Sequence, residues 1–234
     1  MNSFKRGLKS GIPIGLGYLS VSFTFGIMAV SYGFNWWQAL LISMTTLTSA
    51  GQLAGIGVMT VPGQYLEMLI SQLTINARYA FMSLSLSQKV SPSFRTIKRF
   101  LLGFFMTDEI FAVASLETEI SARFFLGLSV APYLGWASGT LLGSLLGSIL
   151  PKVVMNALCL AIYGMFLAIF APAARGSKSI LAVVGAAVLL HTLLTYAPFL
   201  SRIPSGLSIS IAAISAAILG ALLFPVKVEE EVQE

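Results

Sequence analysis

The sequence predicts an all-α, polytopic bundle of membrane helices, and three observations carry that prediction. First, 56% of the 234 residues are hydrophobic and only 10% are charged, whereas a soluble domain carries about 25% charged residues. Second, the apolar residues fall into long runs near the ~20 residues that a helix needs to cross a bilayer core. Third, the runs are joined by short turns. With so few charges available to cover it, the surface must face lipid.

Eight hydrophobic segments follow one another along the chain. We therefore expect about seven or eight apolar elements, of which at least one is broken or re-entrant. A single transmembrane domain over residues 1–226 and a polar tail over residues 227–234 account for the whole sequence. The eight segments cover residues 11–32, 36–60, 64–88, 98–116, 127–149, 153–171, 180–197 and 205–225.

Two clusters of positive charge set the expected topology, one before the first segment and one after the third. Because cytoplasmic loops carry an excess of Lys and Arg, we expect both clusters, and the N-terminus, on the cytoplasmic side. An even number of crossings must then separate them, although three segments lie between. One of the three should enter and leave on the same side, or be broken. The clusters are Lys5, Arg6 and Lys9, and Lys89, Arg95, Lys98 and Arg99.

The second segment is the one that we expect to be discontinuous. Its middle reads Thr45-Thr46-Leu47-Thr48-Ser49-Ala50-Gly51-Gln52, and glycines follow at positions 55 and 57. Hydroxyls, an amide and glycines in the middle of a span are typical of a broken helix that lines a cavity. Thr48, Ser49 and Gln52 would then supply neutral hydrogen bonds near the break, although each hydroxyl has the alternative of bonding a carbonyl of its own helix.

The fifth segment supports two interpretations. It begins near Pro132 as the first begins near Pro13, and this echo suggests an inverted repeat, the usual architecture of secondary transporters. Its glycines at every fourth position from 135 to 147 also form a ridge of small residues, for which close helix packing is a sufficient explanation. If the fourth segment crosses outward, one of the fifth and sixth does not cross.

Charges inside a membrane span are rare and expensive, so each marks a candidate site. Arg78 lies 11 residues before Lys89, and Asp108 lies 9 residues after Arg99. At a rise of ~1.5 Å per residue, both sit near the bilayer midplane, where an arginine and an acid neutralise each other. Glu109 points about 100° away from Asp108 on a helix, so only one of the two acids can face Arg78 directly.

Two interpretations of these charges stay open. Either they form a structural ion pair that fixes helix packing, or one acid pairs with Arg78 while the other faces a cavity. An acid in such a cavity can exchange protons, which makes Asp108 or Glu109 the coupling site of a proton-driven carrier. Asn76 lies two residues before Arg78 and can line the same polar region.

Several classes of function are excluded. The chain has no Gly-rich phosphate loop ending in Gly-Lys-Ser/Thr, no Ser/His/Asp arrangement, and no His or Glu cluster with metal-ligand spacing. With one cysteine (Cys159) and one histidine (His191), we expect no metal site, no cofactor and no enzyme activity. The net charge of +5 comes from clusters between hydrophobic segments, which favours anionic lipid over nucleic acid as a partner.

In the order of its motifs, the chain resembles the AzlC family of permeases, the large subunits of branched-chain amino acid exporters. The resemblance rests on a Pro/Gly-rich first span, on a small-residue-and-Gln motif, on Asn-x-Arg and Thr-Asp-Glu elements, and on the glycine-rich fifth segment. These are Gly11 to Tyr18, Thr48-Ser49-Ala50-Gly51-Gln52, Asn76-Ala77-Arg78-Tyr79, Thr107-Asp108-Glu109-Ile110-Phe111, and Tyr133, Gly135, Trp136 and Gly139.

The resemblance implies a secondary transporter that exports leucine, isoleucine, valine and analogues by alternating access. It also implies a small, separately encoded AzlD-type membrane subunit as partner, and a location in the cell membrane of a bacterium. A passive channel or facilitator for small polar solutes is the alternative. Half-helix termini near Gly51 would help to hold a substrate carboxylate. The expected substrate and coupling residues are Arg78, Asp108, Glu109, Asn76, Gln52, Ser49, Gly51 and Thr107, with no catalytic residue among them.

Overall fold

The computed structural model confirms the predicted helical membrane architecture. It describes residues 3–92, 94, 96–149, 151, 153–154, 167, 171, 174–200, 203 and 205–225. Within these residues the chain is helical apart from its connections and one isolated β-bridge between Val90 and Ile120. Almost all of the sixth predicted segment, 153–171, and the whole tail at 227–234 lie outside the described residues.

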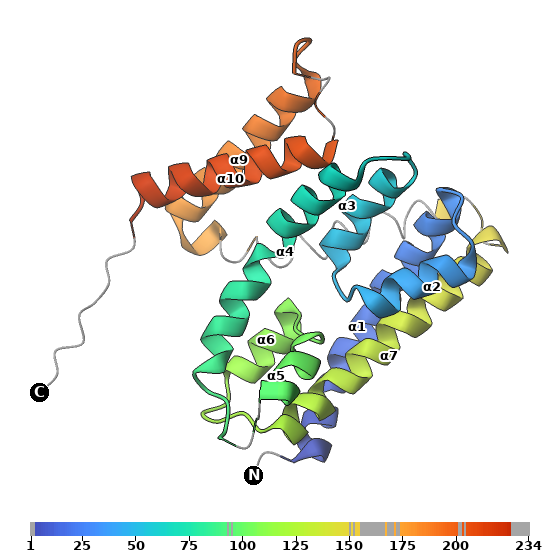
Figure 1. The fold of residues 1–234 in the computed structure, drawn as a ribbon, viewed down its shortest axis with the longest axis vertical. Helices are drawn as coiled ribbons and strands as arrows, with labels where there is room; N and C mark the ends of the chain where they lie inside the picture. The colour runs from blue at the N-terminus through green and yellow to red at the C-terminus, as the bar shows by residue number, and fades with distance from the viewer. Residues whose placement is uncertain are drawn as a thin grey trace, which may run out of the picture. The chain divides into compact units, whose positions relative to one another are not determined.

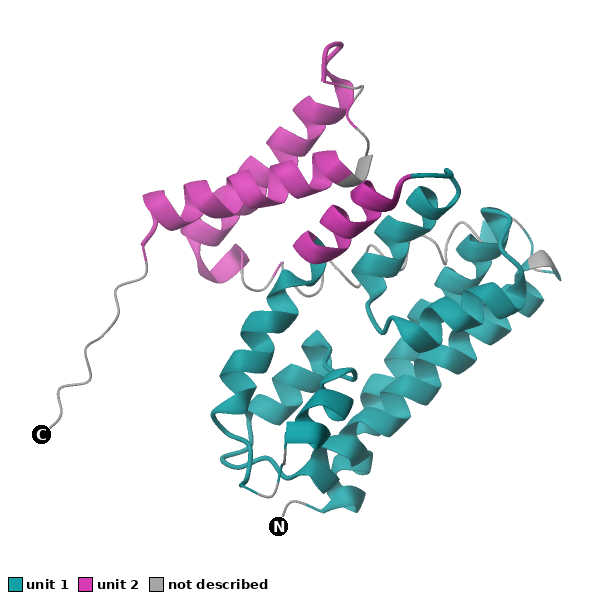
Figure 2. Cartoon of the chain, viewed as in Figure 1, with its two compact units in different colours: residues 1–63, 75–165 teal, residues 64–74, 166–234 magenta. Residues whose placement is uncertain are grey.

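The chain divides into two compact units, shown in teal and magenta in Figure 2. The first comprises residues 1–63 and 75–165, and the second comprises residues 64–74 and 166–234. Helix α4 (Tyr65–Ser87) starts in the second unit and continues in the first. That residues 1–226 act as one transmembrane domain stays a prediction.

The second unit contains two apolar helices that pack against each other. Helix α9 spans Lys178–Tyr196 and helix α10 spans Ser205–Leu223. Gly220 of α10 lies against the Val183 side chain of α9. The Ser208 hydroxyl lies 3.5 Å from Nδ1 of His191, so the single histidine has a hydrogen-bond partner between these helices.

The first unit holds the remaining helices and the C-terminal half of α4. Among the described helices, α1, α7 and α9 are long and apolar enough to cross a membrane, and residues 207–223 form a shorter apolar helix. This number is below the seven or eight predicted segments. The second and fourth segments each fold as two short helices, almost all of the sixth lies outside the described residues, and α4 is not among these candidates. The helices of the first unit are α1 (Phe4–Ser31), α2 (Trp36–Thr45), α3 (Ser49–Met59), α5 (Thr96–Gly103), α6 (Asp108–Ser115) and α7 (Ala122–Leu146), followed by the 3₁₀ turn η1 (Gly147–Ile149).

Helices α1 and α7 lie side by side and run in the same direction (Figure 1). Gly7 lies against the backbone of Phe124 near the start of both helices, and Gly143 lies against the backbone of Phe23 near their ends. The glycine ridge therefore serves close packing, as one of the two interpretations predicted. Helices related by an inverted repeat run in opposite directions, so the echo between the prolines of α1 and α7 is not the sign of such a repeat.

Helices α2 and α3 form a re-entrant hairpin with a break at Thr46–Thr48, where the sequence predicted one. At the tip, Leu47 packs in a cluster with Tyr18 in the middle of α1. Both arms return to the far part of α1, since Ala39 and Ile56 share a buried cluster with Phe25 and Ala29. The second segment thus enters and leaves on one side.

Helices α5 and α6 form a second hairpin, which enters from the opposite end of the unit. Its tip contains Thr107, next to Tyr18. Its last residues return to the N-terminus of the chain, where Arg6 pairs with Glu117 at 2.6 Å and Lys89 Nζ donates to the Ser115 carbonyl at 2.8 Å. The fourth segment therefore folds back on itself. The sequence had also allowed it to cross outward, and the structure does not show that arrangement.

These contacts gather the two positive clusters at one end of the first unit, which we call the basic end. Its landmarks are Arg6, Lys89 and Arg99. The two clusters thus lie at the same end of the first unit, and that an even number of crossings separates them stays a prediction. A helix followed by a re-entrant hairpin thus occurs twice, with opposite directions, as α1 with α2–α3 and as α4 with α5–α6.

Candidate functional site

The tips of the two hairpins meet at a small pocket in the middle of the first unit. Helices α1, α4 and α7 complete its walls. The space open to the centre of a water-sized sphere is about 10 Å³, which is room for about one water molecule. The lining residues are Tyr18, Leu47, Ser49, Tyr79, Thr107, Asp108, Glu109 and Trp136.

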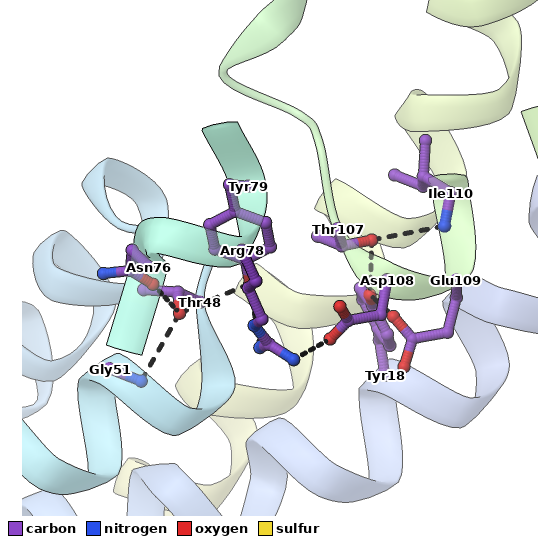
Figure 3. Close-up of polar contacts among 10 residues, drawn as sticks. All are labelled: Tyr18, Thr48, Gly51, Asn76, Arg78, Tyr79, Thr107, Asp108, Glu109 and Ile110. Carbon is purple, nitrogen blue, oxygen red and sulfur yellow. Dashed lines mark hydrogen bonds and ion pairs between the residues drawn. The ribbon is translucent and has the colours of Figure 1, made fainter. Parts of the chain in front are cut away.

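Arg78 of α4 and Asp108 of α6 form an ion pair at one side of this pocket (Figure 3). A guanidinium nitrogen lies 2.5 Å from a carboxylate oxygen, with 37% of the arginine side chain and 28% of the aspartate side chain exposed. The contact that equal depth predicted is confirmed. Nε of Arg78 is buried without a hydrogen-bond partner within the described part of the chain, so the guanidinium retains an unused donor.

Glu109 faces the other way and is held by α1. The hydroxyl of Tyr18 donates a hydrogen bond to the Glu109 carboxylate and lies 2.7 Å from the Thr107 hydroxyl. Tyr18 is 7% exposed, so this bond is shielded from water. The expectation that only one of two adjacent acids faces Arg78 is confirmed, because the ~100° step on α6 turns Glu109 toward α1.

The tip of the first hairpin is tied to α4 through Thr48. Its hydroxyl donates to the Asn76 side-chain oxygen at 2.8 Å and accepts from the backbone N–H of Gly51 at 3.4 Å. The Tyr79 hydroxyl lies 3.4 Å from the Thr48 hydroxyl. A guanidinium nitrogen of Arg78 lies 3.3 Å from the same Tyr79 hydroxyl. The break and the ion pair are therefore connected by one hydrogen-bond chain (Figure 3).

Gln52 closes the break from the side of α7. Its amide nitrogen donates to the Thr46 carbonyl at 2.7 Å, and its amide oxygen accepts from Trp136 Nε1 at 3.1 Å. A broken helix leaves carbonyls without intrahelical partners, and this amide satisfies one of them. Trp136 in turn packs edge-on against Tyr18, with 5.3 Å between ring centroids.

Both half-helices that begin at the tips direct their N-termini to the pocket. Helix α3 begins at Ser49 after the cap Thr48, and α6 begins at Asp108 after the cap Thr107. The positive end of a helix dipole favours an anion. At α6 that anion is the chain's own Asp108, whereas at α3 the first residue, Ser49, is neutral.

The electrostatics of the pocket follow from three side chains. Arg78 and Asp108 neutralise each other, and Glu109 adds one further negative charge when it is ionised. Across the described residues there is no group of three or more His, Cys, Asp or Glu side chains that could hold a metal ion. The pocket therefore carries one acid, Glu109, beyond the neutralised pair.

All eight predicted site residues lie at or next to this pocket, but their roles differ. Gln52 and Asn76 organise the hairpin tip, and Gly51 belongs to its first turn. Tyr18, Tyr79 and Trp136 also line the pocket, although their sequence motifs predicted no role for these side chains. A polar-tipped aromatic in a glycine-rich span is the signal that marks Tyr18 and Trp136, because such a ring must find a polar partner when buried.

Comparison with known proteins shows which family this arrangement belongs to. The family model described as "AzlC protein" matches residues 13–150. The chain belongs to the AzlC family. The matched AzlC range includes Tyr18, Arg78, Asp108 and Trp136, and it ends before α9 begins.

Relatives of this AzlC-family chain occur in archaea and bacteria, and they mark it as a multi-pass membrane protein. An uncharacterized membrane protein of Archaeoglobus fulgidus is 34% identical over 80% of this chain and 83% of its own length. The inner membrane protein YgaZ of Escherichia coli is 25% identical over 60% of each chain. The branched-chain amino acid transport protein AzlC of Bacillus subtilis is 25% identical over 72% of this chain and 66% of its own length. No solved structure matches.

Proposed function

We propose that the chain is the large subunit of a secondary transporter that exports branched-chain amino acids by alternating access. Membership of the AzlC family and the name of the B. subtilis relative support a transport role. The direction, the coupling and the substrate are our inference. The N-terminus and the basic end are assigned to the cytoplasm by their positive charge.

One observation carries the proposal: Asp108 is neutralised by Arg78, while Glu109 remains as a second acid beside the pocket. A structural ion pair alone needs one acid only. The second acid offers an acceptor for the ammonium group of an amino acid. The N-terminus of α3, at the neutral Ser49, offers donors for its carboxylate. The two charges of a zwitterion thus have separate partners on the two hairpin tips.

The size of the pocket supports alternating access over a passive pore. Room for about one water molecule is too little for leucine, so the hairpin tips must separate for a substrate to bind. Re-entrant half-helices that meet at the midplane are typical of carriers in which one element rocks against another. A facilitator with a permanently open polar path is the less suitable alternative.

We infer that export is coupled to protons through the same acid. An ammonium group and a proton compete for Glu109, so protonation from outside releases the substrate and deprotonation inside prepares the site again. Tyr18 holds the carboxylate in place through this exchange. We infer that a small AzlD-type subunit completes the transporter.

The decisive experiment is efflux of radiolabelled leucine from bacteria that lack their own exporters and carry this chain with its small partner. We expect efflux above that of empty cells, and concentrative efflux that collapses in Glu109→Gln while membrane levels of the protein stay normal. Equal efflux from Glu109→Gln and wild type, or accelerated equilibration without accumulation, would replace the carrier by a facilitator. A well-expressed pair that leaves leucine, isoleucine and valine untouched would overturn the substrate class.

A further inference from the structure

A second pocket lies at the basic end of the first unit, between the end of α4 and the start of the α5–α6 hairpin. We call it the basic-end pocket. Its space for the centre of a water-sized sphere is about 100 Å³, against about 10 Å³ in the central pocket.

The deeper part of the basic-end pocket is apolar. Leu86, Phe94, Met106 and Phe125 line it, and all four are buried members of one hydrophobic cluster. The rings of Phe94 and Phe125 meet edge to face with 6.2 Å between centroids. A branched aliphatic group that enters here exchanges water for apolar contacts, which favours its binding.

A positive charge stands at the rim of this pocket. Nε of Arg99 donates to the Phe94 carbonyl at 2.9 Å, which holds the guanidinium beside the apolar wall. The ion pairs among the described residues are Arg6–Glu117 and Arg78–Asp108. No described acid therefore lies within 4.0 Å of the Arg99 guanidinium. A guanidinium without an acidic partner is suited to bidentate binding of a carboxylate.

The two pockets lie on either side of one hairpin tip. Met106 lines the basic-end pocket, and the next residue, Thr107, lines the central pocket and contacts Tyr18. This tip therefore separates the two spaces.

We propose that the basic-end pocket is a vestibule in which an apolar α-amino acid docks before it reaches the central pocket. Its carboxylate binds Arg99, and its side chain lies on Leu86, Phe94 and Phe125. This inference rests on the proposed function. The same charge and apolar contacts suit an anionic lipid, and the binding experiment below distinguishes the two ligands.

Gly103 allows the vestibule to be filled without disturbing the fold. It lines the basic-end pocket, and a Cβ added there meets no atom within 4 Å. A matched control is Gly185 in α9, where a Cβ also meets open space and which lines neither the basic-end pocket nor the central pocket. The test measures the rate of leucine export against internal leucine concentration for Gly103→Leu, Gly185→Leu and Arg99→Gln.

For Gly103→Leu and Arg99→Gln we expect an apparent KM about 10-fold above wild type, with a maximal rate within about twofold, because docking is weakened and the central site is intact. Gly185→Leu should match wild type. An unchanged KM in Gly103→Leu, with normal export, overturns the vestibule and leaves the transporter standing.

A direct binding arm separates the vestibule from the proposed function. The purified full-length chain is heated with leucine, or with phosphatidylglycerol vesicles, and its unfolding temperature is recorded. If no variant exports leucine, the proposed function fails. Protection by leucine that Gly103→Leu abolishes and Glu109→Gln retains then still upholds the pocket. Protection by phosphatidylglycerol alone, or by neither, overturns it.

Discussion

A guanidinium nitrogen of Arg78 lies 2.5 Å from a carboxylate oxygen of Asp108, and this pair joins α4 to the tip of the α5–α6 hairpin. Glu109, the residue after Asp108, is not part of this ion pair. Its carboxylate instead accepts a hydrogen bond from the hydroxyl of Tyr18 in α1. Two adjacent acids therefore hold the same hairpin tip to two different helices. Each connection can be removed separately.

Removal of one partner of the ion pair should destabilise the protein more than removal of both. Arg78→Gln leaves Asp108 uncompensated near the midplane, and because the pair is partly exposed we expect a loss of about 1–3 kcal/mol. The double variant Arg78→Gln with Asp108→Asn should recover most of that loss. Thermal unfolding of the purified chain in detergent measures both. A double variant as unstable as the single one would contradict a compensated pair.

Tyr18→Phe should impair transport while it preserves the fold. The ring keeps its packing against Trp136, whereas the Glu109 carboxylate loses a shielded hydrogen-bond donor, a bond to a charged group that contributes about 1.5–3 kcal/mol. We expect leucine efflux to fall about 10-fold with little change in unfolding temperature. Ser20→Ala is the matched control, because its hydroxyl bonds only the carbonyl of Gly17 in its own helix.

Gln52→Leu should loosen the break in the first hairpin. The variant keeps the approximate volume but leaves the buried indole N–H of Trp136 without its partner, at a cost of about 1–3 kcal/mol. The carbonyl of the exposed residue Thr46 loses one donor and keeps the backbone N–H of Thr48. We expect a lower unfolding temperature, and an unfolding temperature equal to that of the wild type would contradict this role of Gln52.

Gly143→Ala should separate α1 and α7. A Cβ there meets the backbone of Phe23, so the helices must move apart, with a cost of about 1–3 kcal/mol. Gly17 of α1 has open space at its Cβ position, and Gly17→Ala should be neutral or stabilise the helix by up to about 1 kcal/mol. Folded yield and unfolding temperature measure both changes. Equal effects of the two variants would contradict the close seam.

The re-entrant hairpins can be tested by labelling single cysteines in a Cys159→Ser background. Tyr32 and Val61 flank the first hairpin at the far end, and Gln88 and Thr118 flank the second at the basic end. We expect an impermeant thiol reagent to label Tyr32→Cys and Val61→Cys from one side of the membrane, and the other two variants only from the opposite side. Labelling of Tyr32→Cys and Val61→Cys from different sides would mean that the segment crosses.

The sequence alone determined the class of this protein, because hydrophobic content and charge clusters act through local sums. Low charge predicted a surface that faces lipid, and the two positive clusters required one non-crossing segment before Lys89. The hydroxyls and glycines around Thr48 located the break, since a polar mid-span segment must leave the regular helix. The depth of Arg78 and Asp108 predicted their contact from rise per residue alone.

Other features depended on tertiary structure. The fourth segment is apolar enough to cross, and only its packing shows it as a hairpin, since Glu117 returns to Arg6. Arg78 pairs with Asp108 and not with Glu109 because of how α6 is rotated about its axis. In this orientation Thr107, the cap of α6, contacts Tyr18 of α1. Tyr18 and Trp136 lie more than 100 residues apart in the sequence, and their role arises because the glycine seam brings α1 and α7 into backbone contact.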